Sequence, residues 1–198
     1  MMLEPNTRVL LTHPFRAPPG HQFDCGIATT YSLDLTTLLG ATLHLSLFGE
    51  VGAAEDLKNG VALLEALRRT STRLGVFCQT GQIPPPKMAH VLYGLLEPMV
   101  VPVSAPLGGV FHPKLWVLRF ISAGSAPSVL LRVLVLSRNL TNDRCWDVSL
   151  ALEGAPTGMN RRDNEGLRDL VSSLPDMARG ISDELRNQTA LLAGEIHS

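Results

Sequence analysis

Cysteines are few in this sequence, and their placement excludes a cysteine-built framework. The chain has three, Cys25, Cys78 and Cys145, spread over 198 residues with no C-x-x-C or Cys/His ligand spacing. An odd number of widely separated cysteines argues against a disulfide scaffold and against a cysteine-rich metal centre. We expect reduced thiols in the core or at the surface.

The sequence also lacks a large net charge and long apolar runs. The formal net charge is -1, so the chain lacks the global basic surface of non-specific duplex binders, and any nucleic-acid contact should be local. No apolar run approaches the roughly 20 residues that span a bilayer. Residues 1–15 also lack a charged start, a long apolar stretch and a small-residue cleavage site. These absences predict a soluble, cytoplasmic protein with no membrane partner.

What the sequence does have is enough apolar material for a substantial core, at 45% hydrophobic and 18% charged residues. We expect residues 1–198 to form one compact domain, with residues 161–198 as a C-terminal helical segment.

The spacing of apolar residues along the chain predicts an approximate order of strands and helices. Strands are expected at 23–31, 74–80, 99–103, 111–120, 129–137 and 146–154, and helices at 33–47, 53–73 and 87–96 and in the segment after 161. Strands that first alternate with helices and then cluster predict an α/β sandwich with a mixed sheet flanked by helices. The nearly continuous apolar run at 129–137 predicts a central strand covered on both faces.

The segment around His112 and Lys114 carries the first chemical signal. Both residues interrupt an apolar stretch, and in a strand residues two apart project from the same face. Phe111, Leu115 and Val117 would then face the core. An imidazole beside an ammonium among apolar residues is costly without a partner, which indicates an anion site.

A second polar pair follows the apolar run at 129–137. Ser137 and Asn139 are also two apart and lie where the strand should end, which is where open α/β sheets commonly bind ligands. Both side chains can donate hydrogen bonds to phosphate oxygens. The four residues together predict a phosphate-binding site.

These residues resemble the motif of the phospholipase D superfamily, H-x-K followed by S-x-N, here His112-Pro-Lys114 and Ser137-Arg138-Asn139. The continuation Leu140-Thr141 and the downstream Trp146 are similar to the nuclease and tyrosyl-DNA phosphodiesterase-like branches.

The resemblance implies a phospholipase D-like fold and a metal-independent phosphodiesterase without a cofactor. By this resemblance His112 acts as nucleophile or general acid, Lys114 and Asn139 stabilise charge on the phosphoryl oxygens, and Ser137 supports them. Arg138, Thr141 and Trp146 would lie beside a nucleic-acid substrate, DNA rather than RNA, although core packing is the alternative for Trp146.

The sequence departs from the family pattern at several points. Full motifs carry an acid five residues after the lysine, where this chain has Arg119, and Leu136 replaces the glycine that often precedes the serine. The longer gap between lysine and serine is explained by an inserted hairpin loop at 121–128. Arg119, Arg132, Arg138 and Arg144 could line a groove for a phosphate backbone or simply balance Asp143, Asp147 and Glu153.

The most consequential departure is that the chain has a single H-x-K, whereas the superfamily site needs two motifs. A homodimer or a second motif-bearing half would complete it. The alternatives are a non-catalytic module that binds nucleic acid or an assembly partner in a larger complex, such as a bacterial defence complex, and a lipid phosphodiesterase. The neighbouring segment at 29–34 is interpreted as a strand-to-helix turn capped by Ser32 or Asp34.

Overall fold

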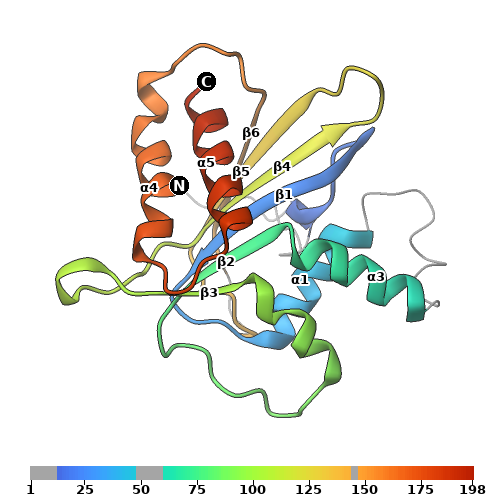
Figure 1. The fold of residues 1–198 in the computed structure, drawn as a ribbon, viewed down its shortest axis with the longest axis vertical. Coiled ribbons are helices and arrows are strands. Elements are labelled where there is room, and N and C mark those ends of the chain that lie inside the picture. Colours follow the sequence, from blue (N-terminus) through green and yellow to red (C-terminus); the bar gives the residue numbers. More distant parts are fainter. Residues whose placement is uncertain (1–12, 48–59, 144–146) are drawn as a thin grey trace.

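A six-stranded mixed sheet forms the centre of the fold, with helices on both faces (Figure 1). The computed structural model describes residues 13–47, 60–143 and 147–198. The strands are β1 (His21–Thr30), β2 (Leu74–Gln79), β3 (Val100–Val103), β4 (Leu115–Ser122), β5 (Val129–Leu136) and β6 (Ser149–Gly154), and the helices are α1 (Leu35–Leu47), α3 (Gly60–Ser71), α4 (Glu165–Met177) and α5 (Asp183–His197).

The strand order, β3-β2-β1-β4-β5-β6, combines a parallel and an antiparallel half. β1 pairs in parallel with β2, and β2 with β3, whereas β4, β5 and β6 each run antiparallel to the preceding strand in the sheet. The carboxyl ends of β1, β2, β3 and β5 therefore meet the amino ends of β4 and β6 at one edge of the sheet.

Alternating side chains of the strands fill two cores. Trp116, Leu118 and Phe120 of β4 face α1, where Phe15 packs on Trp116 with ring centroids 4.6 Å apart. The opposite face carries Leu115 and Val117 against α4 and α5, and Phe111 joins this core as expected. The period-2 alternation of β4 thus supplies both sides of a three-layer structure.

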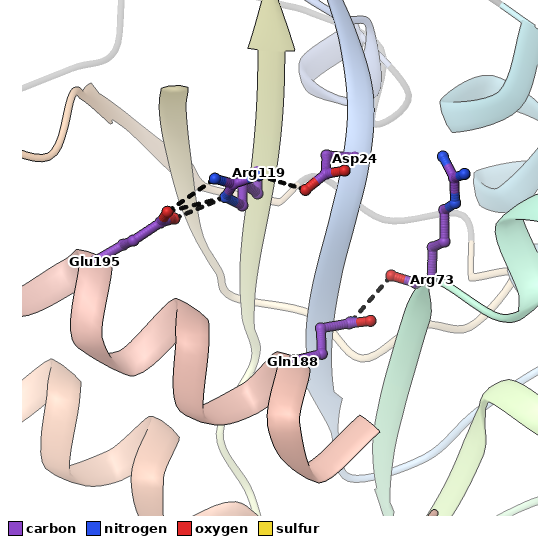
Figure 2. Close-up of polar contacts among 5 residues, drawn as sticks. All are labelled: Asp24, Arg73, Arg119, Gln188 and Glu195. Carbon is purple, nitrogen blue, oxygen red and sulfur yellow. Dashed lines mark hydrogen bonds and ion pairs between the residues drawn. The ribbon is translucent and has the colours of Figure 1, made fainter. Parts of the chain in front are cut away.

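An ionic cluster fixes α5 to the sheet, as Figure 2 shows. The Arg119 guanidinium of β4 donates to Glu195 of α5 at 2.8 Å and to Asp24 of β1 at 2.5 Å. Arg119 and Glu195 expose only 15% and 16% of their side chains. Farther along α5, the Gln188 amide donates to the Arg73 carbonyl at 3.0 Å. Arg119 is therefore a structural residue on the α5 face.

Most of the expected elements are present. The mixed α/β sheet with flanking helices is confirmed, and so are α1, both C-terminal helices and the hairpin loop between β4 and β5. Cys25 and Cys78 are buried free thiols, and burial raises the pKa of each to about 12. Residues 53–59 of the expected helix at 53–73, and Cys145, lie outside the described residues.

Three expectations are wrong. The segment 87–96 forms no α-helix but a short 3-10 turn, Val91–Leu95, none of whose residues is buried to hold a longer helix, and a second turn, Glu97–Met99, follows it. The strand expected from residue 111 begins at Leu115. β5 is not covered along its whole length, since β6 at the sheet edge is exposed throughout and Val135 is 46% exposed.

The turn before α1 is capped by Asp34. Its carboxylate accepts hydrogen bonds from the backbone N–H and the hydroxyl of Thr37, at 2.8 and 2.9 Å. We expect Asp34→Ala to lower the free energy of unfolding by about 1 kcal/mol, the typical cost of a lost N-cap. Ser32→Ala is the matched control and should change it little. Urea denaturation of both variants checks this, and an equal loss in both would contradict it.

Candidate active site

His112, Lys114, Ser137 and Asn139 flank the edge of the sheet where β1 and β5 end and β4 begins, an edge that can be followed in Figure 1. His112 and Lys114 precede β4, and Ser137 to Asn139 follow β5. The Leu136 N–H donates to the Lys114 carbonyl at 2.9 Å, which joins the two segments through the backbone. This is the edge at which open α/β sheets commonly bind ligands.

His112 and Lys114 approach each other although they do not lie within a strand. The Lys114 Nζ is 2.9 Å from Nδ1 and 3.2 Å from Nε2 of His112, and 3.2 Å from the His112 carbonyl oxygen. The ammonium donates to the His112 carbonyl oxygen, and it can donate to whichever ring nitrogen carries no proton. His112 is exposed and Lys114 half-buried, and desolvation lowers the pKa of Lys114 below its ordinary value. A cation and an imidazole are thus held side by side at an accessible position.

The extended segment that carries His112 is anchored at both ends. The Phe111 N–H donates to the side-chain carbonyl of Gln79 at 2.7 Å, and the Leu115 N–H donates to the Thr29 hydroxyl at 2.9 Å. Pro113 has no N–H to add to a ladder. Side chains of β1 and β2 therefore replace the strand pairing that the sequence predicted here.

Asn139 is held by the segment that follows β1. Its Oδ1 accepts a hydrogen bond from the Tyr31 backbone N–H at 3.3 Å, and in the described part of the chain its Nδ2 makes no hydrogen bond. The next residue, Leu140, is buried, and its N–H donates to the Thr30 hydroxyl at 3.0 Å. The amide nitrogen of Asn139 is consequently available as a donor for an anion.

Ser137 is placed differently from the other three motif residues. Its hydroxyl donates to Asp147 at 3.3 Å and accepts from the Val148 N–H at 3.0 Å. These bonds join the end of β5 to the chain that enters β6. The Ser137 hydroxyl therefore bonds to the chain entering β6 and not to His112, Lys114 or Asn139.

The residues expected to bind substrate are engaged within the fold where they are described. Arg138 pairs with Asp147 at 3.0 Å and donates to the carbonyls of Thr141 and Asp143. The Thr141 hydroxyl donates to the Asp143 carboxylate at 2.5 Å. Trp146 lies outside the described residues, as does Arg144.

The other arginines near the motif also have internal partners. Arg119 pairs with Asp24 and Glu195, and Arg132 pairs with Glu153. Among the described arginines, the arrangement thus favours internal charge balance over a groove for a phosphate backbone.

The sequence analysis missed Gln79 and Tyr31. Gln79 is a polar residue at the end of an apolar strand, which is the available signal for it. Tyr31 lies in the segment interpreted as a turn, yet its ring centroid is 5.2 Å from that of His112, with the planes tilted by 47°. Neither is recognisable from the sequence, because their proximity to His112 depends on the sheet order, in which β1 lies between β2 and β4.

The arrangement offers an imidazole, a cation and an amide donor, a set suited to holding a phosphoryl group and attacking or protonating it. In the described residues, no group of three or more His, Cys, Asp or Glu side chains is placed to bind a metal ion. None of the described helices combines the length and hydropathy that crossing a membrane requires.

Comparison with known proteins shows similarity in structure but not in sequence. No family model and no curated protein matches the sequence. Yeast tyrosyl-DNA phosphodiesterase, a phospholipase D superfamily member, has a similar structure with a TM-score of 0.52 and 13% identity, over 89% of this chain and 36% of that one. Two mutants of the yeast enzyme give TM-scores of 0.55 and 0.56 at 12% and 11% identity, over 92% and 93% of this chain and 36% and 37% of theirs. The chain spans little more than a third of the length of these proteins, and it has the α/β, phospholipase D-like fold of that part.

Proposed function

We propose that this chain carries one half of a phosphodiesterase active site that cleaves nucleic acid, DNA rather than RNA, through a phosphohistidine and without a metal. The observation that carries the proposal is the contact of His112 with Lys114, 2.9 Å from Nδ1 to Nζ, beside Asn139 at the open edge of the sheet. The structural similarity to a tyrosyl-DNA phosphodiesterase supports DNA as the substrate class.

The proposed reaction has two displacements at phosphorus. A neutral imidazole attacks the phosphorus, the N–P bond forms, and the bond to the leaving oxygen breaks while a second histidine donates a proton to that oxygen. Water then attacks the same phosphorus, gives its proton to the second histidine, and the N–P bond breaks. Lys114 and Asn139 neutralise charge on the phosphoryl oxygens in both steps.

The second histidine must come from outside this half-site. His112 begins the only H-x-K of the sequence, so the partner is either a second copy of the chain or another motif-bearing half. Measurement of the molecular mass of the active species in solution separates the two. Activity in a pure homodimer supports the first, and activity that appears only with an added second protein supports the second.

An activity assay in EDTA tests the function itself. Single-stranded DNA, duplex DNA, RNA and phospholipid vesicles are incubated with the assembled protein, and cleavage of DNA is expected to be fastest. Headgroup release from vesicles without DNA cleavage would establish a lipid phosphodiesterase instead. Tight, salt-sensitive DNA binding without cleavage would establish a binding module.

Lys114 makes the proposed activity depend on pH in a definite direction. Because desolvation disfavours its charged form, Lys114 loses its proton at a lower pH than an exposed lysine. We expect kcat/KM to fall as the pH rises through this pKa. Lys114→Arg, which stays charged, should remove the alkaline limb while lowering kcat/KM at neutral pH about 10-fold or more, since the guanidinium is a poor replacement for a compact ammonium.

Profiles of kcat/KM for both proteins from about pH 6 to about pH 11 check the role of Lys114. An alkaline limb that is identical in Lys114→Arg would contradict the assignment.

A further inference from the structure

Tyr31 contacts both motif segments from the end of β1. Its ring lies against the imidazole of His112, with centroids 5.2 Å apart and planes tilted by 47°. Its backbone N–H donates to Asn139 Oδ1 at 3.3 Å. The residue thus contacts both the histidine expected to act as nucleophile or general acid and the expected oxyanion donor.

The Tyr31 backbone is itself fixed by the middle of the sheet. The preceding Thr29 and Thr30 are each only 2% exposed. The Thr29 hydroxyl receives the N–H of Leu115 and the Thr30 hydroxyl receives that of Leu140, at 2.9 and 3.0 Å. The Cys78 thiol donates to the Tyr31 carbonyl at 3.5 Å. These hydrogen bonds fix the backbone that carries Tyr31 and therefore limit how far its side chain can move from His112.

His112 needs such support because its other side-chain contact is one that the reaction must break. The Lys114 Nζ lies 2.9 Å from Nδ1 of His112. When a phosphodiester enters, its negative oxygens compete for the ammonium, and the exposed imidazole loses this contact. The aromatic contact with Tyr31 carries no charge and can persist, because tilted ring pairs are stable at this separation.

We propose that Tyr31 is a positioning residue, whose ring keeps the His112 imidazole aimed at phosphorus once Lys114 has turned to the phosphoryl oxygens. The inference rests on the proposed function for its catalytic consequence, but the ring contact is testable without turnover. The phenol hydroxyl has no part in it, so phenylalanine should serve in place of tyrosine.

The test compares Tyr31→Phe with Tyr31→Leu in the assembled protein, with a defined single-stranded DNA as substrate. We expect Tyr31→Phe to keep kcat within about twofold of the natural chain. Tyr31→Leu should lower kcat about 10-fold to about 100-fold, as small misplacements of reacting groups do, with a smaller change in KM. Urea denaturation of each variant checks folding, and Tyr31→Met replaces the leucine variant if the latter does not fold.

A second readout records the His112 ring directly. Carbon-proton NMR correlation, with His112→Ala used to assign the signal, should show a ring-current shift of the His112 protons in the natural chain and in Tyr31→Phe, and its loss in Tyr31→Leu. A shift and a kcat that are unchanged in Tyr31→Leu would overturn the inference and leave the proposed function intact. Equal loss of kcat in both variants would also overturn it, since the hydroxyl would then be responsible.

The two proposals fail in distinguishable ways. If the natural chain cleaves no phosphodiester, the proposed function is wrong, and the NMR comparison alone decides whether Tyr31 orients the imidazole. An unchanged His112 signal in Tyr31→Leu then overturns the positioning role as well.

Discussion

Substitution of His112 by alanine is expected to lower kcat for DNA cleavage by about 1,000-fold or more, the loss that follows from removing an essential nucleophile or proton donor. In a homodimer the loss of kcat should exceed that from removing a single histidine, because each active site would lose both of its histidines. The side chain is exposed, so its removal should leave the free energy of unfolding nearly unchanged. Single-turnover assays in EDTA, with protein in excess over DNA, measure the loss.

His13→Ala is a matched control for this prediction. His13 is also exposed and lies in a short 3-10 turn, His13–Phe15, away from the motif in sequence. Cleavage by this variant should equal that of the natural chain. If His112→Ala, folded and assembled, cleaved DNA at a similar rate, the assignment of the active site to this edge of the sheet would be wrong.

Arg119→Ala is expected to have the largest effect on stability, lowering the free energy of unfolding by about 3 kcal/mol. The substitution leaves the carboxylates of Asp24 and Glu195 without their shared cation, and breaking a largely buried pair by removing one partner costs about 3 to 5 kcal/mol. The lower end applies because Asp24 is 28% exposed and water can partly replace the cation.

Urea denaturation measures this loss, and two comparisons show its cause. Arg68→Ala removes an arginine from an exposed i,i+3 pair with Glu65 on α3 and should have little effect. The triple variant Asp24→Leu, Arg119→Met, Glu195→Leu should recover much of the stability, because no charge is then left unpaired. Equal losses in Arg119→Ala and Arg68→Ala would contradict the structural role of this cluster.

The layers of the fold were largely predictable because they depend on local patterns. Alternation along β4 and the continuous apolar run of β5 identify strands whatever their neighbours, and the spacing in α4 and α5 identifies helices. The short turns at 91–99 were not predictable in this way. Their apolar residues match a helical period, but none of Val91–Leu95 is buried, and only Leu96 and Met99 at the end of the segment are buried in the core.

The candidate site was predictable only where the sequence carries motif letters. His112, Lys114 and Asn139 could be selected from their spacing, and the structure brings them to one edge. Sequence spacing placed His112 within a strand, whereas the neighbouring N–H groups of Phe111 and Leu115 donate to Gln79 and Thr29 and hold it in an extended segment. Tyr31 could not be found at all, because its contact with His112 arises from the pairing of β1 with β4, 86 residues apart at Thr29 and Leu115.

Arg119 shows how a departure from a motif acquires meaning from structure. In the sequence it stands where related motifs have an acid, which casts doubt on the site. In the structure it points to the α5 face and holds that helix. Packing of α5 on the sheet therefore explains why this position holds an arginine.

Trapping of a covalent intermediate tests directly whether a histidine attacks phosphorus in the proposed reaction. The assembled protein is mixed with a short labelled DNA, quenched at alkaline pH during turnover to preserve a phosphohistidine, digested and analysed by mass spectrometry. If the partner is a second copy, we expect a nucleotide adduct on His112 and no adduct in His112→Ala. If the partner is another motif-bearing half, we expect the adduct on His112 or on its counterpart in that half. Turnover by the natural chain with no histidine adduct at any time point would contradict attack by a histidine.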